Sequence, residues 1–92
     1  MAIGVIWRPP IDQQTYDAIK EKVIDAAYGG GLRYHAAGQS GGGWCIIEVW
    51  DSDEGLDTFM RDTLNPAVEE VSKGQAPPME RPETFEVYFQ GP

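Results

Sequence analysis

The chain has 92 residues, which is enough for one small domain and too few for two independent hydrophobic cores. Fifteen acidic against seven basic residues give a net charge of -8, which argues against nucleic acids and anionic membranes as partners because phosphates need clustered cations. The single cysteine, Cys45, excludes an internal disulfide, and no apolar run approaches the ~20 residues that span a bilayer. With no secretion signal at its start, the sequence predicts a cytoplasmic protein.

We interpret the last residues of the chain as an addition made for protein expression and not as part of the natural protein. Residues 86–92 read EVYFQGP and differ at one position from EVLFQGP, the recognition sequence of a viral 3C-type protease used in protein expression. We therefore interpret residues 90–92 as an engineered tail, leave the origin of Phe89 open, and expect a single domain over residues 1–89. Coincidence in a native tail is the alternative.

The first half of the chain predicts a strand, a helix and a hairpin. Residues 2–7 are apolar and stop before two prolines, as a strand does. Asp12 is a good N-cap for an amphipathic helix that ends at the glycines 29–31, and its apolar face recurs at Tyr16, Ile19, Val23 and Ala27. Residues 32–39 and 44–50 predict two strands joined by a four-residue loop, 40–43.

The second half predicts two helical segments and a last strand. Asp51 or Ser52 caps the first segment, whose buried stripe is Leu56, Phe59, Met60 and Leu64. Asn65-Pro66 starts the second segment, because asparagine caps well and proline suits a first turn. Residues 74–82 contain three prolines and are expected to form a loop, and residues 84–89 are expected to form the last strand.

This order of elements, β-α-β-β-α-(α)-β, predicts an α+β fold of the split βαβ, ferredoxin-like type. Its four-stranded antiparallel sheet carries the helices on one face. Both sets of alternating strand residues are largely apolar: Cys45, Ile47 and Val49 on one face, Trp44, Ile46 and Trp50 on the other. Because helices cover one face only, the uncovered face predicts a homodimer.

Motifs for cofactors and metals are missing from the sequence. It has no phosphate-binding or dinucleotide-binding glycine pattern, so the glycine triplets are interpreted as turns. Residues 51–55 resemble the start of a calcium loop, but the glycine comes one position early and residue 62 is Asp where a bidentate Glu is required. One histidine and one cysteine cannot build a zinc site within one chain. We expect no cofactor and no metal.

The hairpin register singles out the candidate catalytic residues, His35 and Glu48. A loop at 40–43 pairs Gln39 with Trp44 and sets His35 opposite Glu48 on one face of the sheet, with Ala37 opposite Ile46 and Arg33 opposite Trp50. A carboxylate favours the protonated form of a neighbouring imidazole and fixes its tautomer, so this pair can shuttle a proton for a bound aromatic molecule. The alternatives are a structural His–Glu pair at a pocket rim and tryptophans that are simply core.

The segment Glu48-Val49-Trp50-Asp51-Ser52-x-Glu54-x-x-x-x-Phe59 resembles the dimeric α+β barrel superfamily, which includes antibiotic-biosynthesis monooxygenases, heme-degrading monooxygenases and polyketide cyclases. The resemblance implies a ferredoxin-like protomer whose sheet pairs with a second copy, and a ligand pocket between sheet and helices. It implies further that no metal or flavin is needed, because the substrate itself activates oxygen. The tryptophan matching Trp50 lines that pocket in the family, and the substrate-binding candidates here are Trp7, Arg33, Trp44, Trp50 and Phe59.

The sequence also departs from each subfamily. Ile46 and Leu56 stand where the monooxygenases have asparagine and tyrosine, and residues 67–69 lack the helical histidine that binds iron in heme degraders. The cyclases carry a catalytic histidine where Val68 stands here. The sequence therefore predicts a small-molecule enzyme, monooxygenase-like or cyclase/isomerase-like, acting on an aromatic or polyketide-like compound. A non-catalytic ligand-binding or structural dimer of the same fold is the alternative.

Overall fold

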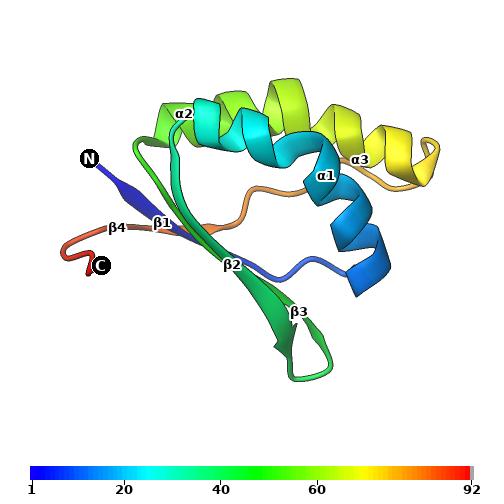
Figure 1. Cartoon of the computed structure of the whole chain (residues 1–92), viewed down its shortest axis with the longest axis horizontal. Helices are drawn as coiled ribbons and strands as arrows, with labels where there is room; N and C mark the ends of the chain where they lie inside the picture. The colour runs from blue at the N-terminus through cyan, green and yellow to red at the C-terminus, as the bar shows by residue number, and fades with distance from the viewer. Residues whose placement is uncertain (92) are drawn as a thin grey trace.

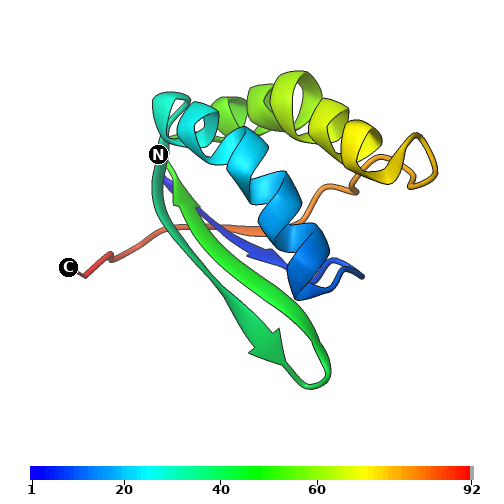
Figure 2. The same ribbon diagram turned by 45° about the vertical axis from the view of Figure 1, so that its right-hand side comes forward.

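Strand β1 (Ile3–Trp7) lies inside the sheet, between β3 (Gly43–Trp50) and β4 (Glu83–Glu86), while β2 (Leu32–Ser40) pairs with the outer side of β3. The computed structural model describes residues 1–91, so Pro92, in the predicted engineered tail, lies outside the described residues. All strand pairs are antiparallel in the order β2-β3-β1-β4, and the helices lie on one face (Figures 1 and 2). The predicted α+β class and antiparallel four-stranded sheet are confirmed, and they are compatible with a ferredoxin-like fold.

Helix α1 (Gln13–Gly29) begins where the sequence predicts. The Asp12 side chain accepts a hydrogen bond from the Thr15 backbone N–H at 2.8 Å, which satisfies one of the free donors of the first turn. The helix buries Ile19, Val23 and Ala27 against the sheet. This predicted apolar stripe therefore fixes which side of α1 faces the strands.

The second helical segment is longer and more continuous than predicted. Ser52 caps α2 (Asp53–Phe59) by accepting from the Gly55 N–H at 3.0 Å, and a π-helical turn, η1 (Met60–Leu64), joins it to α3 (Asn65–Ser72). Helix α3 begins at Asn65-Pro66 as predicted, but the capping role of Asn65 is wrong, since Asn65 is itself helical and its Oδ1 accepts from the Met79 N–H at 2.9 Å. Pro66 has no N–H to give to the preceding turn, and η1 lies just before it.

The hairpin is tighter than predicted. Each strand extends by one residue, and the turn consists of Gly41 and Gly42, both with positive φ (59° and 82°), as a two-residue type I′ turn requires. The predicted register holds for Gln39 with Trp44, Ala37 with Ile46, and His35 with Glu48. A β-bulge between Leu32 and Tyr34 removes Arg33 from this ladder, so the predicted pairing of Arg33 with Trp50 is wrong and Leu32 stands there instead.

The last strand is shorter than predicted. Strand β4 covers Glu83–Glu86 rather than residues 84–89, and the Val87 N–H donates to the Ala2 carbonyl at 3.0 Å just beyond it. Tyr88 and Phe89 are exposed. No helix within residues 1–91 combines the length and the apolar character that crossing a membrane requires.

The two faces of the sheet differ in how they are covered. The helix-facing side holds the core, in which Val5, Trp50 and Leu56 are fully buried. The opposite face exposes Tyr34, Ile47 and Phe85, at 50%, 40% and 49% of their surface. These three residues share the face with half-buried Ile6, Cys45 and Val49, and we call this set the outer face.

Candidate functional site

The confirmed register brings His35 and Glu48 together on the helix-facing side of the sheet. His35 comes from β2 and Glu48 from the neighbouring β3, and the imidazole Nδ1 lies 2.7 Å from Glu48 Oε2. Both side chains are largely buried, with 15% and 8% of their surface exposed. The predicted catalytic pair is therefore a direct contact in a poorly solvated position.

Glu48 is surrounded by hydrogen-bond donors. The indole N–H groups of Trp7 and Trp50 both donate to Glu48 Oε1, each at 3.0 Å, while His35 contacts Oε2. An ionised carboxylate is acceptor-only and fits three such partners, whereas a buried carboxylate without partners would be costly. Glu48 thus acts as the anion of the network, and His35 carries its proton on Nδ1 toward it.

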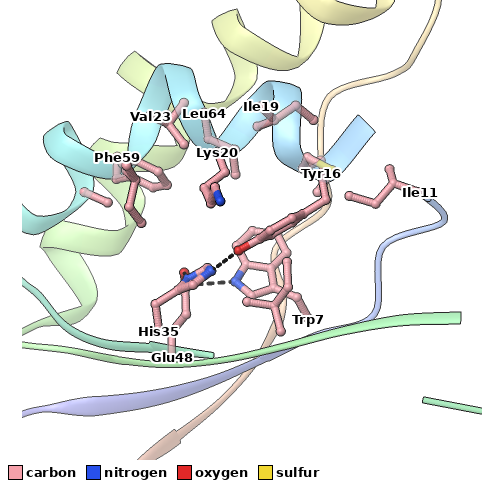
Figure 3. Close-up of a pocket in the computed structure, with 14 residues that line it drawn as sticks. Trp7, Ile11, Tyr16, Ile19, Lys20, Val23, His35, Glu48, Phe59 and Leu64 are labelled. Carbon is pink, nitrogen blue, oxygen red and sulfur yellow. Dashed lines mark hydrogen bonds and ion pairs between the residues drawn. The ribbon is translucent and has the colours of Figure 1, made fainter. Parts of the chain in front are cut away.

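A third member, Tyr16, completes the chain from the helix side. Its hydroxyl lies 2.5 Å from His35 Nε2, on the other side of the ring from Glu48. Burial, followed by the negative charges of Glu48 and Asp17, raises the pKa of Tyr16, so the phenol keeps its proton. With the imidazole proton on Nδ1, Nε2 is the acceptor and the phenol donates to it. The result is a directional chain, Tyr16 to His35 to Glu48 (Figure 3).

The sequence interpretation missed Tyr16. The sequence predicts Tyr16 as part of the apolar stripe of α1, and this pattern does not single out its hydroxyl. The available signal was its position in the first turn, where the helix stripe faces the strand that carries His35. A hydroxyl on a stripe of otherwise apolar residues needs a partner when the stripe is buried, and this requirement could have marked it.

The chain of hydrogen bonds borders a cavity of about 60 Å³ between α1 and the sheet. Tyr16, His35 and Glu48 line it together with apolar side chains, and the Lys20 ammonium points from α1 into the space above His35 (Figure 3). The apolar part of the lining is Trp7, Ile11, Ile19, Val23, Ile24, Ala27, Ile46, Phe59, Leu64 and Met79. The polar chain therefore ends in a largely apolar space, as in many small-molecule sites.

The predicted substrate-binding residues fall into two groups. Trp7 and Phe59 line the cavity. Trp50 lies behind it, fully buried and tilted against Phe59 at a ring-centroid distance of 5.1 Å. Trp44 packs on Tyr16 at 5.2 Å, and its buried indole N–H has no hydrogen-bond partner among residues 1–91. Arg33 is exposed at the beginning of β2, away from the hairpin turn, and forms an ion pair with Asp51.

The described residues offer no obvious metal centre. Within residues 1–91, no three His, Cys, Asp or Glu side chains are grouped closely enough to hold a metal ion. What the site provides instead is a base with a fixed tautomer, a phenol that bridges this base to the cavity, and a buried anion that would stabilise the imidazolium. This arrangement is suited to accepting a proton from a bound molecule and returning it.

No protein-family model matches the chain, and no curated protein matches it either. Membership of the dimeric α+β barrel superfamily is therefore part of the proposal that follows.

Proposed function

We propose that the protein is a small-molecule enzyme of the dimeric α+β barrel type, related to cofactor-independent monooxygenases, that acts on an aromatic or polyketide-like compound. The observation that carries the proposal is the Tyr16–His35–Glu48 chain at the edge of an apolar cavity. A purely structural His–Glu pair has no need of a third, proton-bearing group that reaches a cavity. The chain provides the proton transfer, and the apolar lining excludes water.

The proton path follows from the hydrogen bonds. A ligand hydroxyl, or an acidic ring C–H, that reaches Tyr16 gives its proton to the phenol oxygen while the phenol proton moves to His35 Nε2. His35 then carries a positive charge next to the Glu48 carboxylate, 2.7 Å away. This ion pair stabilises the state in which the ligand is an electron-rich anion.

The resemblance supplies the oxidation step of the proposal. The ligand anion, with dioxygen as the oxidant, converts a ring CH₂ to a carbonyl: one oxygen atom enters the product, and the other leaves as water with the two hydrogens. In this scheme the protein contributes the proton transfers and the dry site, and the ligand gives up the electrons. A cyclase or isomerase would use the same proton transfers without dioxygen.

The proposal includes a homodimer. The outer face exposes Tyr34, Ile47 and Phe85, and no helix lies over this side of the sheet (Figure 2). A Cβ at Gly4 would overlap the Phe85 ring, so the glycine makes room for this ring over β1. An exposed apolar face without a covering helix favours pairing with an identical sheet.

The second candidate is a binding module or structural dimer of the same fold. It is favoured by one observation: Tyr16, His35 and Glu48 already satisfy one another, as a structural network would. The two candidates differ in whether a bound molecule is converted.

Native mass spectrometry of freshly purified protein, followed by a screen of hydroxylated aromatic compounds in air, tests the proposal. We expect a co-purifying or added aromatic ligand in the mass spectrum and consumption of dioxygen with one compound class. A ligand that binds and remains unchanged under air and under nitrogen would favour the binding module. If no hydroxylated aromatic compound binds, the enzyme and the binding module are both contradicted, and only the structural dimer is left.

A further inference from the structure

A second, larger hollow lies next to the cavity. It is a groove of about 730 Å³, bounded by the β1–α1 connection, the C-terminal part of α3 and the proline-containing loop 74–82. Trp7, Ile11, Ile19 and Met79 line both hollows, so these four side chains form the partition between them. The groove and the cavity are therefore adjacent, with these side chains between them.

The cavity alone is too small for the proposed ligand. Its volume of about 60 Å³ is well below the ~150 Å³ of a cavity that holds one benzene ring. Met79 is the most adaptable member of the partition, because its side chain is unbranched and flexible and its segment lies outside any helix or strand. A ligand longer than one ring can therefore reach Tyr16 only with its body in the groove.

The cations along this space point to an acidic ligand. Four of the seven basic side chains form ion pairs with carboxylates, namely Lys22, Arg33, Arg61 and Arg81. The three that do not, within residues 1–91, are Arg8, Lys20 and Lys73. Arg8 lines the groove and Lys20 lines the cavity. In a chain with fifteen acidic residues, an unpaired cation at each of two adjoining hollows favours a negatively charged occupant.

The two cations have different surroundings. The Lys20 ammonium lies 5.9 Å from the centroid of the Tyr16 ring, beside the end of the proton chain. Arg8 directly follows Trp7, which belongs to the partition, whereas Glu80 and Glu83 line the groove from the loop and β4. Arg81 also lines the groove but pairs with Asp53 and Asp57, so Arg8 is the groove-lining cation that forms no ion pair within residues 1–91.

We propose that the cavity and the groove form one binding site for an elongated, acidic aromatic molecule. Its reacting hydroxyl lies at Tyr16, where Lys20 stabilises the anion left by proton transfer, and a carboxylate or similar group on its apolar body pairs with Arg8. This inference rests on the proposed function and names the substrate class of the same site.

The proposed role of Arg8 and Lys20 in binding an anion is tested with two probes of similar shape, the anion anilinonaphthalene sulfonate and the uncharged phenylnaphthylamine. The double variant Arg8→Gln/Lys20→Gln is compared with Arg61→Gln/Lys73→Gln, which removes the same charge outside both hollows. We expect the first double variant to raise the Kd of the sulfonate about tenfold, the loss of a charge-assisted contact, and to leave the neutral probe unaffected. Equal effects of both double variants on the sulfonate would overturn the proposal.

The location is tested with Ala76→Trp, a larger side chain at an exposed position in the groove wall, and with Ala26→Trp at an exposed position of α1 outside it. We expect Ala76→Trp to weaken the binding of both probes and Ala26→Trp to leave the binding of both unchanged. Normal probe binding by Ala76→Trp would overturn the proposal. These measurements need no turnover. Charge discrimination without conversion of any aromatic compound would therefore refute the proposed enzyme and leave the binding site standing.

Discussion

Glu48 is the residue on which the site depends, since its carboxylate accepts from His35 and from two buried indoles. Glu48→Ala leaves both indole N–H groups without an acceptor and is expected to cost about 3–5 kcal/mol of unfolding free energy. Glu48→Gln keeps an acceptor for the indoles and is expected to cost much less. Urea unfolding of both variants measures the difference, and equal stabilities would show that the indoles do not depend on this group.

Glu48→Gln is also expected to change the tautomer of the His35 ring. Its amide NH₂ would face His35 Nδ1 and make that nitrogen an acceptor, so the proton moves to Nε2 and Tyr16 becomes the acceptor. The ¹⁵N chemical shifts of the His35 ring distinguish the two tautomers. We expect Nδ1–H in the parent protein and Nε2–H in the variant, while an Nε2–H parent would contradict the assigned direction of the chain.

Tyr16 is expected to make the unfolding free energy depend on pH in the alkaline range. Because burial, the larger cause, and Glu48 raise its pKa in the folded protein, folding favours the phenol over the phenolate. This contribution is fully present below the unfolded value of ~10 and is lost as the pH rises through the folded pKa. Tyr16→Phe removes this titration, so its unfolding free energy should decline less at high pH than the parent's. Tyr88→Phe is the control, since Tyr88 is fully exposed.

At the scale of elements, the sequence predicts the fold well because each element carries its own signal. Asp12, the helix stripe and the glycines of the hairpin are local features, and they place α1, β2 and β3. The errors arise where a contact between residues far apart in the sequence determines the local structure. Asn65 is a good cap in isolation, but its side chain is engaged by Met79 fourteen residues later. The bulge at Arg33 leaves no local signature, so the predicted register is correct from Tyr34 onward and fails at Arg33.

The hairpin turn gives a prediction for one element. Gly42 has a φ of 82°, where a side chain costs about 1–2 kcal/mol, so Gly42→Val should lower the unfolding free energy by about that amount. Gly38→Val is the matched control, because a Cβ at Gly38 meets no atom within 4 Å and its φ is not positive. Equal unfolding curves for the two variants would show that the turn is not of this type.

At the scale of the whole molecule, alternation in the strands predicts two apolar faces, and the structure leaves one of them without a helix. The candidate site was only half predictable. His35 and Glu48 follow from strand register, whereas Tyr16 and Lys20 depend on how α1 lies across the sheet, which one sequence does not specify. The family resemblance implies a pocket role for Trp50, but Trp50 lies in the core as a donor to Glu48 and does not line the cavity.

The outer face predicts a dimer in solution. Sedimentation equilibrium at micromolar concentration should show twice the chain mass of 10.2 kDa. Ile47→Lys places a charge in the middle of this face and is expected to give a folded or partly unfolded monomer, while Thr58→Lys on the exposed side of α2 keeps the dimer. A parent protein that sediments as a folded 10.2 kDa species would contradict this prediction.

The central claim is that the Tyr16–His35–Glu48 chain transfers a proton from a bound aromatic molecule. The most direct measurement is the rate of dioxygen consumption with the compound identified by the ligand screen, for the parent, His35→Ala and the exposed control Tyr88→Phe. Loss of a general base typically lowers a rate about 10²–10⁴-fold, so we expect such a drop for His35→Ala with ligand still bound, and no change for the control. An unchanged rate in His35→Ala would contradict the account.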